Sequence, residues 1–325
     1  MNTATTYMGM DLVSPIVLTD AIPDAELLLP MEEAGAGAVV LRPLLEEEII
    51  WDIKLNQREK APTSNYGVNL DYIAERMPKD YVQQYLEQIA TLKQRLSIPV
   101  IAAIDCYSFD SWFSHLQKLT EAGCDAIELD IQLQPFHPSV DTNTVSQFIE
   151  NVTTVFKRVS SLPMSLKISS HFTDMVYFTQ QLSWMGVKNI TLFNDGPSLD
   201  IDLQQQQLVS DIQPHLTSDT LFWTTLCRPN VYIDLSSVVA NGEEAIKALL
   251  VGATTVQISH CNGRTHSTDI QSAHTVLHQW MQKYSYNNIA AFRGRLVPSD
   301  SIKNYHAVRN LYIRGLKEQR EESSF

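Results

Sequence analysis

Eight short apolar segments, alternating with segments of helical periodicity, constrain the fold of this chain most strongly. A continuous run such as Ile16-Val17-Leu18 is typical of a strand buried on both faces of a parallel sheet. The intervening segments place apolar residues at helical spacing, most clearly between Thr142 and Ser160. We predict strands at 14–21, 38–41, 99–105, 126–131, 164–169, 188–194, 231–235 and 255–259. Eight such units favour an α/β fold of the (β/α)8 TIM barrel type over a doubly wound sheet, which needs fewer strands.

The length of 325 residues leaves room for segments beyond one such barrel, which typically takes ~250 residues. We expect one domain over 1–325, with excursions over the C-terminal mouth at about 44–79 and 196–220 and a helical tail at about 293–325. An excursion as long as 44–79 is either a lid or substrate loop, or a plain surface decoration.

The composition narrows the partners and the compartment. A net charge of −13 argues against nucleic-acid and anionic-membrane surfaces, because both need basic patches. We find no signal peptide after Met1 and no apolar run near the ~20 residues that span a bilayer. We therefore expect a cytoplasmic protein with a small-molecule substrate and four reduced cysteines, for which a homodimer is one assembly.

One lysine interrupts an otherwise apolar strand. Lys167 lies within Met164-Ser165-Leu166-Lys167-Ile168, and removing an ammonium group from water is costly unless it meets a partner. In a barrel of this type the active site is formed at the C-terminal ends of the strands. We predict that Lys167 faces a ligand or a carboxylate partner at this mouth.

The other predicted strand ends form a polar ring with Lys167. Its members are Thr19-Asp20-Ala21, Arg42, Asp105, Asp130, Asn194, Ser236-Ser237 and Ser259-His260. Each has a plainer interpretation: Asp105 and Asp130 as helix caps or surface acids, and Asn194 as a turn residue. His274 and His278 are one helical turn apart, but no third ligand accompanies them, so we predict no metal site and expect both to face solvent.

Several stretches together resemble a known family. They include Ser14-Pro15-Ile16-Val17, Ile98-Pro99-Val100-Ile101-Ala102, Leu166-Lys167-Ile168-Ser169 and Leu192-Phe193-Asn194. In this order they resemble the dihydroorotate dehydrogenase-like proteins, FMN-binding TIM barrels related to class 1 dihydroorotate dehydrogenase. The resemblance implies a flavoprotein oxidoreductase acting on CH–CH groups in pyrimidine metabolism.

The resemblance also implies roles for the ring. Lys167 looks like the catalytic lysine that contacts the pyrimidine edge of FMN, and Arg42 stands where the family carries a second flavin-contacting lysine. Thr19, Asp130, Ser236, Ser237, Ser259 and His260 fall at cofactor-binding positions. Asp105 and Asn194 fall at substrate-binding positions.

The sequence departs from the family at two places. Leu133 stands where class 1 enzymes carry a cysteine or serine base, and leucine cannot take a proton. Ser236-Ser237 stands where paired glycines bring backbone N–H groups to the FMN phosphate. We therefore expect weakened or absent FMN binding. Three alternatives stay open: an FMN-dependent oxidoreductase, a catalytically inactive barrel with a binding or regulatory role, and a barrel for another phosphorylated ligand.

Overall fold

The computed structural model describes most of the chain. Its described part is residues 1–322 without 58–77, 79, 109–111, 133–141, 171, 173, 194–198, 211–214, 261–264 and 298–300. Among the helices described there, none is long and apolar enough to cross a membrane.

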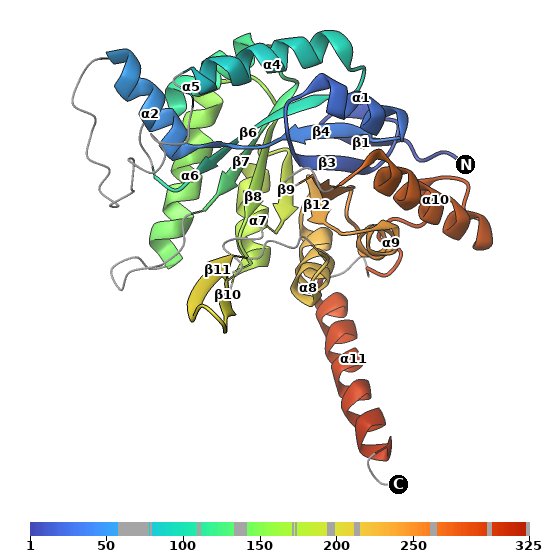
Figure 1. The fold of residues 1–325 in the computed structure, drawn as a ribbon. Helices are drawn as coiled ribbons and strands as arrows, with labels where there is room; N and C mark the ends of the chain where they lie inside the picture. The colour runs from blue at the N-terminus through green and yellow to red at the C-terminus, as the bar shows by residue number, and fades with distance from the viewer. Residues whose placement is uncertain are drawn as a thin grey trace.

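A closed barrel of eight parallel strands forms the centre of the molecule (Figure 1). The strands are β3 (Ile16–Ala21), β4 (Ala38–Leu41), β6 (Val100–Cys106), β7 (Ala126–Ile131), β8 (Met164–Ile168), β9 (Asn189–Leu192), β12 (Asp234–Val238) and β13 (Thr255–Ser259). Pairing of β13 with β3 and of β4 with β6 closes the ring. The predicted (β/α)8 barrel is confirmed.

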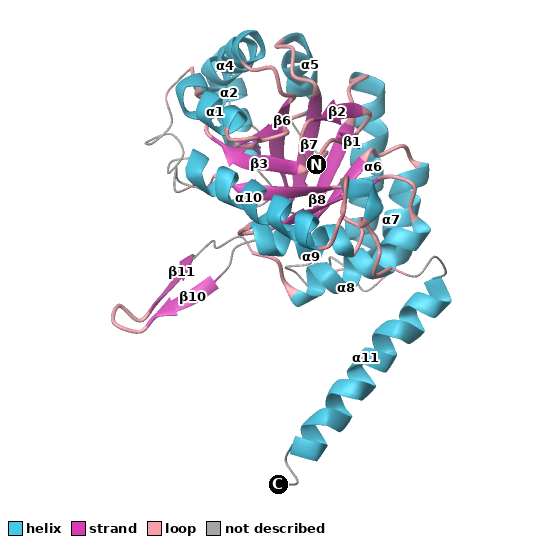
Figure 2. Ribbon diagram, turned by 90° about the vertical axis from the view of Figure 1, so that its right-hand side faces the viewer, coloured by secondary structure: helices cyan, strands magenta, loops and turns pink. Residues whose placement is uncertain are grey.

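Helices surround the barrel, as the view in Figure 2 shows. They are α1 (Ala25–Glu33), α4 (Tyr81–Arg95), α5 (Phe113–Glu121), α6 (Thr142–Val159), α7 (Met175–Trp184), α8 (Ser218–Cys227), α9 (Gly242–Leu250) and α10 (Ser267–Lys283). Apolar residues at helical spacing, such as Leu182 of α7 and Leu277 of α10, are fully buried against the strands.

Strand residues alternate between two environments. Ile127, Leu129 and their counterparts on the other strands point outward into the core beneath the helices. Inward-pointing Val17 and Ile101 form a smaller apolar cluster at the N-terminal end of the barrel. A hairpin of β1 (Thr5–Tyr7) and β2 (Met10–Leu12) plugs that end, where Tyr7 and Leu12 join the cluster.

Further elements lie outside the barrel. They are α2 (Glu46–Gln57) in the first excursion, the hairpin β10 (Leu199–Asp202) and β11 (Gln207–Ser210) in the second, the 3-10 helices η1 (Arg228–Asn230) and η3 (Ile289–Ala291), and the tail helix α11 (Ser301–Glu322). The short strand β5 (Leu44–Leu45), at the start of the first excursion, instead pairs with β6 as part of the barrel sheet. The hairpin and α11 both project from the body in Figures 1 and 2.

The seventh strand of the barrel was predicted wrongly. It spans Asp234–Val238 rather than 231–235, because the backbone N–H of Asp234 is the first in this segment to pair with the neighbouring strand, at Lys188. Tyr232, inside the apolar run that suggested a strand, is 97% exposed. The apolar segment 221–226 that precedes it is part of helix α8, whose first turn is capped by the Thr217 hydroxyl.

Candidate functional site

Strand register brings three ionisable residues together at the mouth. Asp105 of β6 pairs with Asp130 of β7, and Asp130 pairs with Lys167 of β8. Side chains along a strand point alternately into the barrel and out toward the helices, and all three of these residues are at inward-pointing positions. Their side chains therefore enter the barrel side by side. The prediction that Lys167 faces inward at the C-terminal mouth agrees with this geometry.

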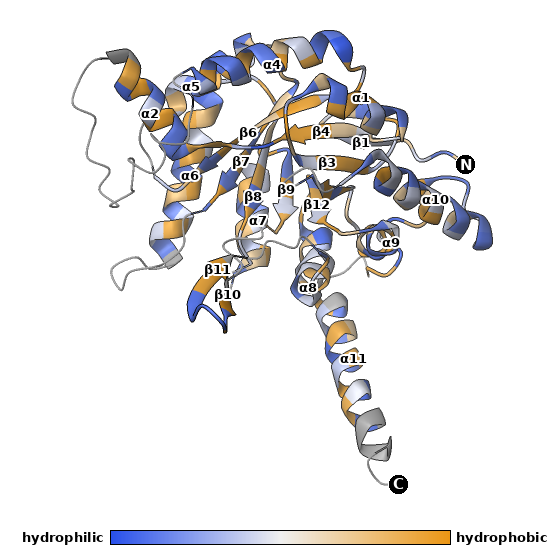
Figure 3. Ribbon diagram, viewed as in Figure 1, coloured by the Kyte–Doolittle hydropathy of each residue, from blue (hydrophilic) through white to orange (hydrophobic). Residues whose placement is uncertain are grey.

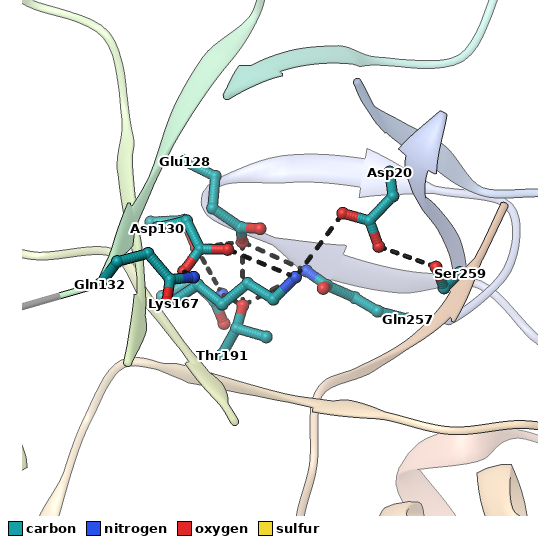
Figure 4. A network of polar contacts seen from close by, with 10 residues as sticks. Asp20, Glu128, Asp130, Gln132, Lys167, Thr191, Gln257 and Ser259 are labelled. Carbon is teal, nitrogen blue, oxygen red and sulfur yellow. Dashed lines mark hydrogen bonds and ion pairs between the residues drawn. The ribbon is translucent and has the colours of Figure 1, made fainter. Parts of the chain in front are cut away.

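Lys167 lies between two carboxylates. Its Nζ is 3.8 Å from Oδ2 of Asp130 and 3.8 Å from Oδ1 of Asp20 (Figure 4). The Lys167 and Asp130 side chains are only 7% and 10% exposed, so this contact is poorly screened by water. The carboxylate partner expected for Lys167 is therefore present, and Asp20 supplies a second.

Asp20 owes its position to an irregularity in β3. Its backbone is in the left-handed region, at φ 53°, and the register between β3 and β4 shifts between Leu18 and Ala21. Aspartate tolerates this conformation better than most residues do. Its second oxygen accepts a hydrogen bond of 2.8 Å from Ser259 of β13. The bulge turns Asp20 toward Lys167, and the sequence carries no signal for it.

The charged groups around Asp105 are mostly carboxylates. Burial, followed by the carboxylates of Asp130, Glu47 and Glu46, raises the pKa of Asp105 well above its usual value, while Lys167 lowers it. The mouth thus holds more acid than one ammonium group can neutralise. A carboxylate-bearing ligand would add a further negative charge here.

A polar layer lies inside the barrel below Lys167. Oε2 of the buried Glu128 accepts hydrogen bonds from Ser165 at 2.8 Å, Thr191 at 2.9 Å and the Gln257 amide at 3.2 Å (Figure 4). Three donors on three strands compensate a carboxylate that has lost its water. Sequence reasoning missed Glu128 and Gln257, although both interrupt apolar strands just as Lys167 does.

Two polar atoms of the inner wall, Oγ1 of Thr19 and Oε1 of Gln257, are buried and lack partners among the described contacts. His260 is also buried, but it has the outward parity of Ile258, and Thr265 and His266 are among its neighbours. Burial lowers the pKa of His260, which favours its neutral form. Buried polar atoms normally find partners. The Thr19 and Gln257 atoms therefore point to a ligand with hydrogen-bonding groups next to Lys167.

The two serines of β12 do not lie in a turn. Ser236 points inward and donates to Asn189 at 3.0 Å, within the polar layer. Ser237 has the parity of Leu235 and faces the helices instead. Both are strand residues without positive φ. The prediction that they replace a phosphate-binding turn is wrong, because the strand continues through them.

The turn that leads into α9 follows the end of β12, at residues 239–241. The Asn241 side chain accepts from the N–H groups of Glu243 and Glu244, at 3.0 and 3.1 Å. Those two acids occupy the first turn of the helix, where the helix dipole would otherwise favour an anion. Gly242 permits close packing, since a Cβ there would lie 2.8 Å from the Ala273 oxygen.

Arg42 lies apart from the lysine cluster. Its guanidinium pairs with Glu48 of α2 at 3.2 Å and lies over the ring of Tyr81. The Glu48 carboxylate also accepts from the Leu45 N–H, so this contact ties α2 to the end of β4. No contact between Arg42 and Lys167 occurs among the interactions described for the two residues.

The remaining expectations concern Asn194, Leu133, the two histidines of α10 and a metal site. Asn194 and Leu133 lie outside the described residues, so their geometry is left open. His274 is not simply solvent-facing, because its Nε2 lies 2.8 Å from both the Ser14 hydroxyl and the Gly35 carbonyl oxygen. Within the described ranges, no cluster of three or more His, Cys, Asp or Glu residues could hold a metal ion.

FMN, which the resemblance implies, meets two different environments here. Near Lys167 the unpartnered Thr19 and Gln257 atoms suit a flat ring with donors and acceptors on its edge. At α9 the helix N-terminus already has an acceptor in Asn241 and carries two acids, which does not suit a phosphate dianion. The described residues fit the ring end of FMN and not the phosphate end at α9.

Comparison with known proteins gives one consistent result. The chain is 24% identical over 273 residues to the dihydroorotate dehydrogenase B (NAD(+)) catalytic subunit of Methanocaldococcus jannaschii, covering 78% of this chain and 85% of that protein. The subunits of the same name from Alkaliphilus metalliredigens and Thermoplasma acidophilum are each 22% identical, covering 80% and 78% of this chain and 86% and 85% of theirs. No protein-family model matches the chain.

Proposed function

From the premise that the chain is a divergent dihydroorotate dehydrogenase-like protein, we propose that it is an FMN-dependent oxidoreductase acting on a small substrate. The observation that carries the proposal is Lys167 at the mouth, held among buried polar atoms that lack partners. A buried lysine at the C-terminal mouth of a barrel, where active sites of this fold lie, is a candidate for a functional-site residue.

Lys167 would hold the ring end of the cofactor. FMN, when bound, supplies a two-electron acceptor for the substrate. The ammonium group of Lys167 would stabilise negative charge on the ring edge, and it is preorganised because Asp20 and Asp130 fix it from two sides. Thr19 and Gln257 would donate to or accept from the same ring.

The substrate differs from a carboxylate such as dihydroorotate. Asp130 stands in register beside Lys167, where its carboxylate would repel a substrate carboxylate, while the raised pKa of Asp105 favours a neutral acid next to it. Leu133 at the base position removes a group whose loss typically costs ~10²–10⁴ in rate. We propose that dihydroorotate is at most a poor substrate, and that Asp105 and Asn194 contact a substrate with hydrogen-bond donors.

A catalytically inactive barrel is the second candidate. It is favoured by the first turn of α9, where Asn241 caps the N–H groups and Glu243 and Glu244 stand in place of a phosphate site. In that case the mouth binds a ligand without turnover. The resemblance implies a second phosphate-binding segment at 259–263, of which 261–263 lie outside the described residues.

The visible absorption spectrum of the protein as purified separates the two candidates. The oxidoreductase predicts flavin absorption bands in the purified protein or, because the α9 end does not suit the phosphate, in protein equilibrated with excess FMN. A protein that takes up no FMN in equilibrium dialysis against an excess of the cofactor would contradict the proposal.

A further inference from the structure

The tail helix α11 extends away from the barrel and exposes most of its surface. It begins beside α8, its main contact with the body, and projects outward for the rest of its length (Figures 1 and 2). Isolated helices in water are marginal, and most gain their stability from packing an apolar face. A projecting helix of 22 residues therefore calls for a partner surface.

One side of α11 carries an apolar stripe, defined here as Tyr305, Tyr312, Ile313 and Leu316. Their spacing places all four within a band about 100° wide on an α-helix. Their exposed fractions are 56%, 57%, 39% and 40%. Figure 3 shows apolar and polar residues mixed along the helix.

The charge of α11 is opposite to that of the body. Residues 301–322 contain five basic residues, Lys303, Arg309, Arg314, Lys317 and Arg320, and three acidic ones, all after residue 317, so the helix carries +2. Because the whole chain carries −13, the remainder carries −15. A basic helix is attracted to an acidic surface, and the chain itself provides one.

The body also exposes an aromatic patch, defined here as Tyr177, Trp184 and Tyr232. The first two lie on one face of α7, seven residues apart, at 62% and 66% exposure. Gln180 lies between them on that face and donates to the Asn230 carbonyl, so the segment leading to Tyr232 lies beside it. Helix α7 packs on α8, the helix from which α11 departs.

We propose that α11 is a dimerisation arm whose apolar stripe docks on the aromatic patch of a second copy of this chain. The two stripes and two patches together hold fourteen side chains. At roughly 100 Å² for each half-exposed side chain, docking removes on the order of 1,400 Å² of accessible surface from solvent. This area lies within the range of specific protein interfaces. In a dimer with a two-fold axis, each copy places its stripe on the patch of the other copy, so both stripes and both patches are covered.

Sedimentation velocity on the full-length protein tests the arm. The wild-type protein should sediment at twice the chain mass of 36.7 kDa. The variant Tyr305→Glu/Tyr312→Glu should sediment as a monomer that still unfolds cooperatively, at a Tm that no longer depends on protein concentration. Leu311→Glu is the matched control, because Leu311 is 61% exposed but lies on the opposite side of the helix, and it should remain dimeric.

Two further variants test the docking site and the charge. Trp184→Glu in the patch should also give monomers, and Arg314→Glu/Lys317→Glu should weaken dimerisation at least tenfold. A monomeric wild-type protein, or a dimer that survives the stripe variant, would overturn the proposal. Monomers that co-sediment with phosphatidylserine vesicles through the stripe would also overturn it, in favour of a membrane-surface helix.

Discussion

Replacing Lys167 by methionine should destabilise the protein by about 3 kcal/mol at pH 7. The ammonium group lies 3.8 Å from each of two carboxylates, and at an effective dielectric constant of ~20 each contact is worth about 4 kcal/mol before desolvation. Removing one partner of a buried ion pair typically costs 3–5 kcal/mol, because the remaining charge is left uncompensated. Asp20 is 28% exposed and can recover some hydration, so we expect the lower end.

A double-mutant cycle with Asp130→Asn isolates the interaction. In urea unfolding, the double variant should lose about 1–3 kcal/mol less than the two single variants together. Lys93→Met is the matched control: Lys93 and Asp125 are closer, at 2.6 Å, but their side chains are 29% and 30% exposed. We expect the control to cost less than about 1 kcal/mol.

The refuting results are specific. If Lys167→Met is neutral or stabilising, the lysine is not held by Asp20 and Asp130. If Lys93→Met costs as much as Lys167→Met, distance rather than burial determines the strength of these pairs. Either result would remove the preorganisation assigned to Lys167.

Two further predictions concern the scaffold. Burial, followed by the charge of Lys118, lowers the pKa of His115 to about 4, so the unfolded chain binds a proton at higher pH than the folded one. The free energy of unfolding should therefore fall by up to about 3 kcal/mol as the pH drops from about 6.5 to 4. In urea unfolding, His115→Gln should reduce this dependence of the unfolding free energy on pH. An unchanged pH dependence in the variant would contradict the lowered pKa of His115. Gly37→Ala should cost about 3 kcal/mol or more, because its Cβ would lie 2.0 Å from the Ser14 oxygen. Gly123→Ala, at φ 91° with open space around it, should cost about 1 kcal/mol; equal thermal shifts for the two glycine variants would contradict this reasoning.

The barrel could be predicted from the sequence because buried parallel strands leave a strong signal. Runs such as Ala38–Leu41 and Ala126–Ile131 have the bounds expected for them. The bounds of the seventh barrel strand, β12, were predicted wrongly because Ser236 resembles a loop residue. It is accommodated within a strand because Asn189 and Thr255 satisfy its hydroxyl inside a polar barrel.

The candidate site was predictable in part. Lys167 stood out because it interrupts an apolar run, and the same reasoning applies to Glu128 and Gln257. Asp20 could not be selected from the strand-end ring, because its approach to Lys167 depends on a bulge and a left-handed backbone. Helix α2 was missed because Glu46, Glu47 and Glu48 resemble a solvated charge run. In the structure Glu46 instead accepts from the backbone N–H groups of Tyr107 and Ser108.

Titration of cofactor-free protein with FMN, followed by quenching of flavin fluorescence, tests the central claim most directly. Because the ring end of the site fits and the α9 end does not, we predict saturable binding that is weakened at least tenfold in Lys167→Ala. The control Lys93→Ala, in an ion pair away from the mouth, should bind FMN as the wild-type protein does. Equal binding by the wild-type and Lys167→Ala proteins would contradict the role of Lys167, and the absence of any binding would favour the inactive barrel.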